Sequence, residues 1–161
     1  EGICTICGAK KTRDNGSKLT ATMKLNVTSI KLQKKQSTTK VKVTGLANGD
    51  SVKSWISSNK KIVTVDKSGK IKAGKKTGNA KITVTLKSGK KAILKVKVQS
   101  TKVKTTKITG LKTNFTLKKG KSLTLKPVVA PITSQEKVTY TTSNKKIATI
   151  TKNGVVKLQL R

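Results

Sequence analysis

The residues best suited to chemistry are Cys4 and Cys7, the only cysteines among the 161 residues. Their Cys-x-x-Cys spacing supplies half of the ligands that tetrahedral zinc requires, and the sequence has no histidine to supply the others. A thioredoxin-like redox pair would need a βαβ context, which the sequence lacks. Three alternatives therefore stand for this pair: a disulfide or an unused pair of thiols, half of a metal site, and redox chemistry.

Catalytic groups of other kinds are scarce. Without histidine the usual proton carrier at neutral pH is missing, and the sequence has no Ser-His-Asp, Cys-His or glycine-rich phosphate-binding motif. The acids are too few and too scattered for the roughly six to eight oxygen ligands of a calcium site; they are Glu1, Asp14, Asp50, Asp66 and Glu136. We therefore expect a protein that is not an enzyme, without catalytic residues and without a cofactor.

Lysine carries the remaining chemistry. The net charge is +33, from 38 basic and 5 acidic residues. This balance favours polyanionic partners: an anionic cell-wall polymer such as teichoic acid, an acidic glycan, or nucleic acid bound without sequence preference. The candidates are lysines that alternate with apolar residues and so share one strand face: Lys40, Lys42, Lys95 and Lys97. The alternative is that lysines only keep the surface soluble and protect sheet edges from aggregation.

The elements that must position these side chains come from an internal repeat. Much of the stretch from Trp55 to Gly74 returns from Tyr140 onward, 85 residues later. In each copy an aromatic residue precedes a Ser/Thr-Ser-Asn corner, a short β-branched strand and a turn that ends in Gly69 or Gly154. A repeat of this length indicates two copies of a small domain.

Apolar and polar residues alternate with the period of β-strands, and no segment of about ten residues shows a helical period. The alternation predicts strands at Ile30–Leu32, Lys40–Val43, Ala80–Leu86 and Ala92–Val98, and at Phe115–Leu117 in the second copy. Short strands separated by turn signals indicate an all-β protein with a β-sandwich fold, and we expect Trp55 between its two sheets. The predicted core residues are Trp55, Tyr140, Ile62, Val65, Ile71, Ile82 and Val84.

The repeat also predicts how the chain is divided. We expect a poorly ordered tail of an upstream module at residues 1–22, a domain at 23–98, a linker at 99–106 and a second domain at 107–161. Counterparts of residues 77–98 would lie beyond Arg161, so the second domain is predicted to be incomplete and open at one sheet edge. No stretch approaches the about 20 apolar residues of a membrane span, so no membrane insertion is expected. The absence of a signal peptide indicates an internal fragment.

The repeated motifs resemble the bacterial immunoglobulin-like domain, group 2. The resemblance is carried by Trp55 or Tyr140 before the Ser-Asn corner, by the strand Ile62–Val65 and by the segment Gly78–Val84. It implies an immunoglobulin-like β-sandwich, with one complete domain and one truncated second copy, in a surface protein of the intimin and invasin type. The segment Cys4–Ala9 resembles the tail of a Cys-x-x-Cys-Gly surface repeat that accompanies such domains.

The resemblance implies a bacterial protein, Gram-positive by our interpretation, that is secreted or exposed at the cell surface. One hypothesis is a non-catalytic module for adhesion, spacing or presentation. Its partners would be neighbouring Ig-like domains of the same polypeptide and an unknown surface or host ligand. The second hypothesis is direct binding of a polyanion by the lysine-rich faces. A third is an accessory domain of a secreted carbohydrate-active enzyme.

Overall fold

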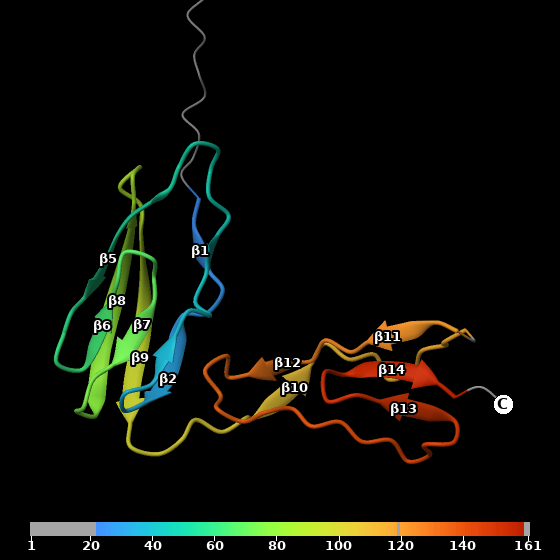
Figure 1. Cartoon of the computed structure of the whole chain (residues 1–161). Helices are drawn as coiled ribbons and strands as arrows, with labels where there is room; N and C mark the ends of the chain where they lie inside the picture. The colour runs from blue at the N-terminus through green and yellow to red at the C-terminus, as the bar shows by residue number, and fades with distance from the viewer. Residues whose placement is uncertain (1–21, 119, 160–161) are drawn as a thin grey trace, which may run out of the picture.

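The computed structural model describes residues 22–118 and 120–159, and within these ranges all regular structure is β-strand. The strands form two units that follow one another along the chain (Figure 1). Cys4, Cys7 and nearly all of the predicted N-terminal tail lie outside the described residues. Within the described ranges there is no helix that could cross a membrane.

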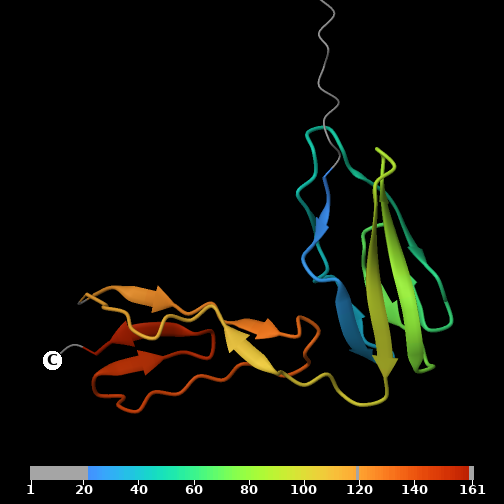
Figure 2. The same cartoon turned by 180° about the vertical axis from the view of Figure 1, so that it is seen from behind.

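The first unit is a sandwich of two sheets, with an additional strand pair at one end. One sheet has the order β2-β9-β8-β5, the other has the order β3-β7-β6, and β1 pairs with β4. Figure 2 shows the first sheet from behind, with the blue strand β2 beside the long strand β9. The strands are β1 (Lys24–Leu25), β2 (Ser29–Gln33), β3 (Ser37–Thr38), β4 (Val43–Thr44), β5 (Val52–Ser57), β6 (Val63–Val65), β7 (Ile71–Ala73), β8 (Gly78–Leu86) and β9 (Lys91–Gln99).

β8 and β9 are the central strands of the four-stranded sheet, and alternation of their side chains explains which face is buried. Along β9, Leu94, Val96 and Val98 are buried, whereas the intervening lysines are exposed. Because successive side chains point to opposite faces of a strand, one face of each sheet enters the core and the other faces water. The core joins both sheets and contains Ile30, Leu32, Val41, Ile62, Val63, Ile71, Ala73, Ala80, Ile82, Leu94, Val96 and Val98.

One predicted strand of the first unit is shorter than expected. Of the segment Lys40–Val43, only Val43 belongs to a strand, in the pair β1-β4. The side chain of Asn26 bonds to the carbonyl of Lys40 and accepts a hydrogen bond from the backbone N–H of Lys42. The prediction was wrong here because a side chain, and not a neighbouring strand, satisfies part of this backbone.

The second unit repeats one of these sheets with the same register. The pair β13-β14 joins Ala148 to Leu158, 85 residues after the pairing of Val63 with Ala73 between β6 and β7. The pair β11-β14 repeats β3-β7 in the same way. The strands are β10 (Lys107–Thr109), β11 (Ser122–Thr124), β12 (Val128–Ala130), β13 (Ala148–Ile150) and β14 (Val155–Leu158).

Among the described residues of the second unit, the four-stranded sheet has no equivalent. The strand predicted at Phe115–Leu117 is not formed, and residues 137–142, which correspond to β5, are not a strand either. The physical reason lies in the strand pairing of the first unit, where β2 pairs only with β9 and β5 pairs only with β8. Counterparts of those two strands are not among the described residues, so both segments lack a pairing partner. Large apolar side chains of this unit are exposed, among them Ile108, Phe115 and Ile147.

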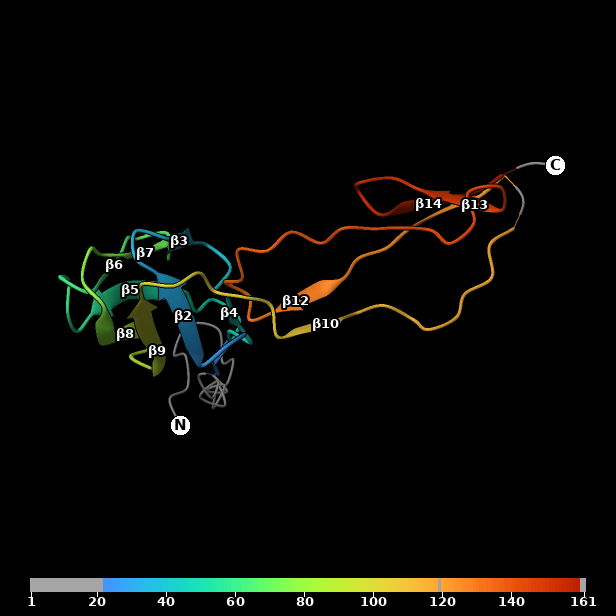
Figure 3. The same ribbon diagram turned by 90° about the horizontal axis from the view of Figure 1, so that it is seen from below.

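A packed and hydrogen-bonded contact joins the two units. Val103, in the predicted linker, is only 2% exposed, and its backbone N–H and carbonyl both bond to Gln135. Gln36 of the first unit donates a hydrogen bond of 2.7 Å to the carbonyl of Thr133, and Ile132 packs against the core of the first unit. We call these residues the joint. Figure 3 shows the second unit extending away from the first beyond this contact.

Candidate functional site

The core residues predicted from the repeat occupy two kinds of position. Ile62, Ile71, Ile82 and Val84 are buried, and Val65 is half-buried against the core. The two aromatic residues are only half-buried. Trp55 packs against the core but is less buried than expected, because it lies on β5, at the edge of the four-stranded sheet.

Each aromatic ring instead packs on the glycine of its own repeat. A Cβ atom added to Gly69 would lie 2.9 Å from Cζ2 of Trp55. One added to Gly154 would lie 2.9 Å from Cζ of Tyr140. Both glycines have positive φ, of 81° and 77°, in the turns before β7 and β14. These aromatic residues thus have a structural role in both copies, and neither lines the groove described next.

The most distinctive surface is the outer face of the sheet β2-β9-β8. The register places Lys31 of β2 opposite Lys97 of β9, and Lys95 of β9 opposite Lys81 of β8. The same two rows contain Ser29 and Asn79 at their ends. Strand alternation explains this grouping, because the buried residues of these strands occupy the positions between them.

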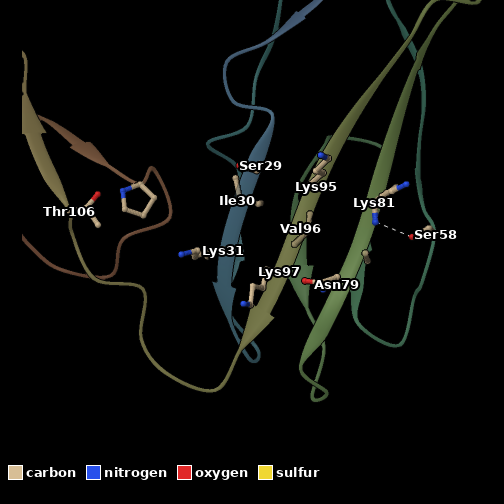
Figure 4. Close-up of a pocket in the computed structure, with 12 residues that line it drawn as sticks. Ser29, Ile30, Lys31, Ser58, Asn79, Lys81, Lys95, Val96, Lys97 and Thr106 are labelled. Atoms are coloured by element: carbon tan, nitrogen blue, oxygen red, sulfur yellow. Dashed lines mark hydrogen bonds between the residues drawn. The ribbon is translucent and has the colours of Figure 1, made fainter.

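A groove with a volume of about 750 Å³ lies on this face. Its remaining wall comes from the second unit, through Thr106 and Pro131 (Figure 4). In that view the Lys31 side chain extends from β2 toward the side on which Thr106 lies. We call this cavity the lysine groove; it is lined by Ser29, Ile30, Lys31, Ser58, Asn79, Ala80, Lys81, Lys95, Val96, Lys97, Thr106 and Pro131.

The electrostatics of the lysine groove favour an anion. Neighbouring strands are about 4.8 Å apart and alternate residues on one strand about 7 Å apart, so the four lysines project from a small area of the sheet. Like charges directly opposite one another across a sheet are destabilising. The spacing of these backbone positions is shorter than the Debye length of about 8 Å at physiological salt, so bulk ions screen repulsion between neighbouring lysines only in part. An anionic ligand would relieve it.

No carboxylate of the described residues lines the lysine groove. Asp50 and Asp66 each accept a hydrogen bond of 2.6 Å from a nearby serine hydroxyl, and Glu136 accepts one from the backbone N–H of Thr105. These hydrogen bonds lower the pKa of each carboxyl group below its ordinary value. The carboxylates of the described residues therefore accept hydrogen bonds that stabilise turns and loops. They also form no cluster of three or more metal-binding side chains within those ranges.

The sequence-based polyanion candidates are divided by the structure. Lys95 and Lys97 line the groove, whereas Lys40 and Lys42 lie on the segment that bonds to Asn26 and do not line it. Sequence reasoning missed Lys31 and Lys81. Their alternation with buried residues was a visible signal, but only the strand order shows that β2 and β8 flank β9.

Comparison with known families agrees with this geometry. Residues 20–96 and 100–158 match the family model of the bacterial Ig-like domain (group 2). The chain belongs to this family. Bacterial Ig-like domains of this group are non-catalytic and occur in extracellular surface proteins of bacteria. The match in two stretches also agrees with the repeated β11-β14-β13 and β3-β7-β6 sheets.

The family assignment confirms the predicted immunoglobulin-like β-sandwich class and its tandem repetition. Domains of this kind mediate protein interactions, but the family alone assigns no ligand to the lysine groove. A comparison with curated proteins found no match.

Proposed function

We propose that this chain is a non-catalytic module of a bacterial surface protein that holds other parts of the protein at a defined distance and angle for presentation or adhesion. The joint supports this proposal. Domains connected by a solvated linker normally move relative to one another. Here Val103 is buried and hydrogen-bonded to Gln135, so the connection has its own packed structure.

The proposal extends to the division of the chain. We propose a first domain at residues 23–98 and a second at 107–161, with the intervening residues 99–106 acting as part of the joint. A second side-chain contact supports this role, since Gln135 donates a hydrogen bond of 3.0 Å to Gln33 of the first domain. The module would lie outside the cell, on the surface of a Gram-positive bacterium, beside further Ig-like domains of the same polypeptide.

Small-angle X-ray scattering of the full chain tests this function. Ile132→Ser removes an apolar contact between the units, so we expect a broader distribution of interdomain distances than in the parent. Ile108→Ser is the matched control, because Ile108 is half exposed and lies outside the joint. If the parent is already as broad as the Ile132→Ser variant, the joint does not hold the two units and the spacer function is rejected.

A second candidate function is polyanion binding, which the lysine groove favours. It concerns a different surface from the joint, and one molecule can both space and bind. The observation behind it is the placement of four lysines opposite one another on β2, β9 and β8, without a carboxylate of the described residues in the groove.

A further inference from the structure

We propose that the lysine groove binds a linear phosphodiester polymer that has neither bases nor aromatic groups, of the poly(alditol phosphate) type. This inference rests on the second candidate function and names its ligand class and its site. The phosphates would lie over the two lysine rows, and the carbon chain between them would lie along the wall formed by Thr106 and Pro131.

The spacing of the lysine positions along the strands sets the type of ligand. Lys31 and Lys97 form one row, Lys95 and Lys81 form the next, and the rows are two residues apart along the strands. Two residues correspond to about 7 Å, so successive anions of a flexible polymer can each lie between a pair of ammonium groups. A lysine ammonium binds phosphate as a point charge and imposes little angular requirement, which suits a flexible polymer.

The other lining residues favour a phosphodiester without bases. Ser29, Ser58 and Asn79 offer hydroxyl and amide donors for phosphate and alcohol oxygens. No aromatic side chain of the described residues lines the groove. Proteins that bind single-stranded nucleic acid stack bases on aromatic rings, and this groove has no such platform. The lining residues can therefore bind charged and hydroxyl groups but cannot stack on a base.

Titration of poly(glycerol phosphate) of defined length into the full chain tests the proposal by calorimetry. The groove variant is Lys31→Gln with Lys97→Gln. Its matched control is Lys61→Gln with Lys72→Gln, which removes the same charge from exposed positions outside the groove. We expect the groove variant to bind at least about tenfold more weakly than the parent, and the control to bind nearly as the parent does.

Salt dependence gives a second readout. Each lysine that contacts a phosphate of a flexible strand contributes about 0.7 to the slope of log affinity against log salt concentration. The groove variant should therefore lose about 1.4 from this slope between about 50 and 200 mM salt, and the control should lose much less. Both variants should melt no lower than the parent, since the two substitutions in the groove relieve repulsion between opposed lysines.

The possible outcomes separate the site from the candidate function. If no polyanion binds even at about 50 mM salt, polyanion binding itself is rejected. If the control loses as much affinity as the groove variant, the chain binds polyanions through its net charge and the groove is rejected as the site. If single-stranded DNA with the same number of phosphates binds more tightly than poly(glycerol phosphate), the ligand class is wrong.

Discussion

Alanine in place of Gly69 would test how each repeat holds its aromatic residue. Gly69 ends the turn between β6 and β7 with φ of 81°, and a Cβ at this position would point at the ring of Trp55. The added Cβ would lie 2.9 Å from Cζ2 and 3.1 Å from Cε2 of that ring, which is closer than normal contact. The substitution therefore combines an unfavourable backbone conformation with a steric clash.

The two effects have separable magnitudes. A residue with a Cβ in the left-handed region costs roughly 1–2 kcal/mol. Overpacking of a fitted contact adds roughly 1–3 kcal/mol, so Gly69→Ala should lower the free energy of unfolding by about 2–5 kcal/mol. Gly89, in the β8-β9 turn, has a similar φ of 87° with no atom within 4 Å of an added Cβ. Gly89→Ala should therefore show the backbone cost alone, about 1–2 kcal/mol.

Urea denaturation followed by far-ultraviolet circular dichroism measures both variants. The decisive comparison is a double-mutant cycle, because in a Trp55→Ala background the ring is gone and Gly69→Ala should cost about as much as Gly89→Ala. The expected coupling between Trp55 and Gly69 is about 1–3 kcal/mol. If Gly69→Ala costs the same in both backgrounds, the packing of the ring on the turn contributes nothing and the reasoning fails.

Three further predictions follow from other features. The hydrogen bond from Ser68 lowers the pKa of Asp66 in the folded state, so the stabilising effect of this carboxylate should be complete above the ordinary pKa of 3.8 and be lost as pH falls through the lower folded pKa. Asp66→Asn should therefore flatten the fall in melting temperature below pH 3.8. Equal slopes of melting temperature against pH in the parent and the variant would contradict this. The buried hydroxyl of Thr133 has no hydrogen-bond partner among the described residues, so Thr133→Val should raise the melting temperature. A lower melting temperature would show that this hydroxyl is hydrogen-bonded. A peptide of residues 78–99, which form β8 and β9, should supply the missing partners in trans and protect residues 114–118 from hydrogen exchange, whereas a scrambled peptide should not.

Much of the fold could be predicted because its determinants are local. Alternating residues in Ala92–Val98 predict which side of β9 is buried, and the structure buries Leu94, Val96 and Val98 as expected. The Ser-Asn corners also depend on local chemistry: the Asn59 and Asn144 side chains accept hydrogen bonds from backbone N–H groups two residues later. Because this chemistry is repeated after 85 residues, the same turns and the same β13-β14 register return in the second unit.

The features that sequence reasoning missed depend on which strands become neighbours. Phe115–Leu117 alternates as a strand should, but a strand needs a partner for its backbone hydrogen bonds, and the described residues supply none. Lys31 and Lys97 are 66 positions apart, and only the parallel pairing of β2 with β9 places them opposite one another. The sequence by itself determined the alternation, the turns and the charge of this protein. The tertiary structure decided the strand order, and with it the lysine groove, because hydrogen bonding between strands acts across distances that local pattern does not encode.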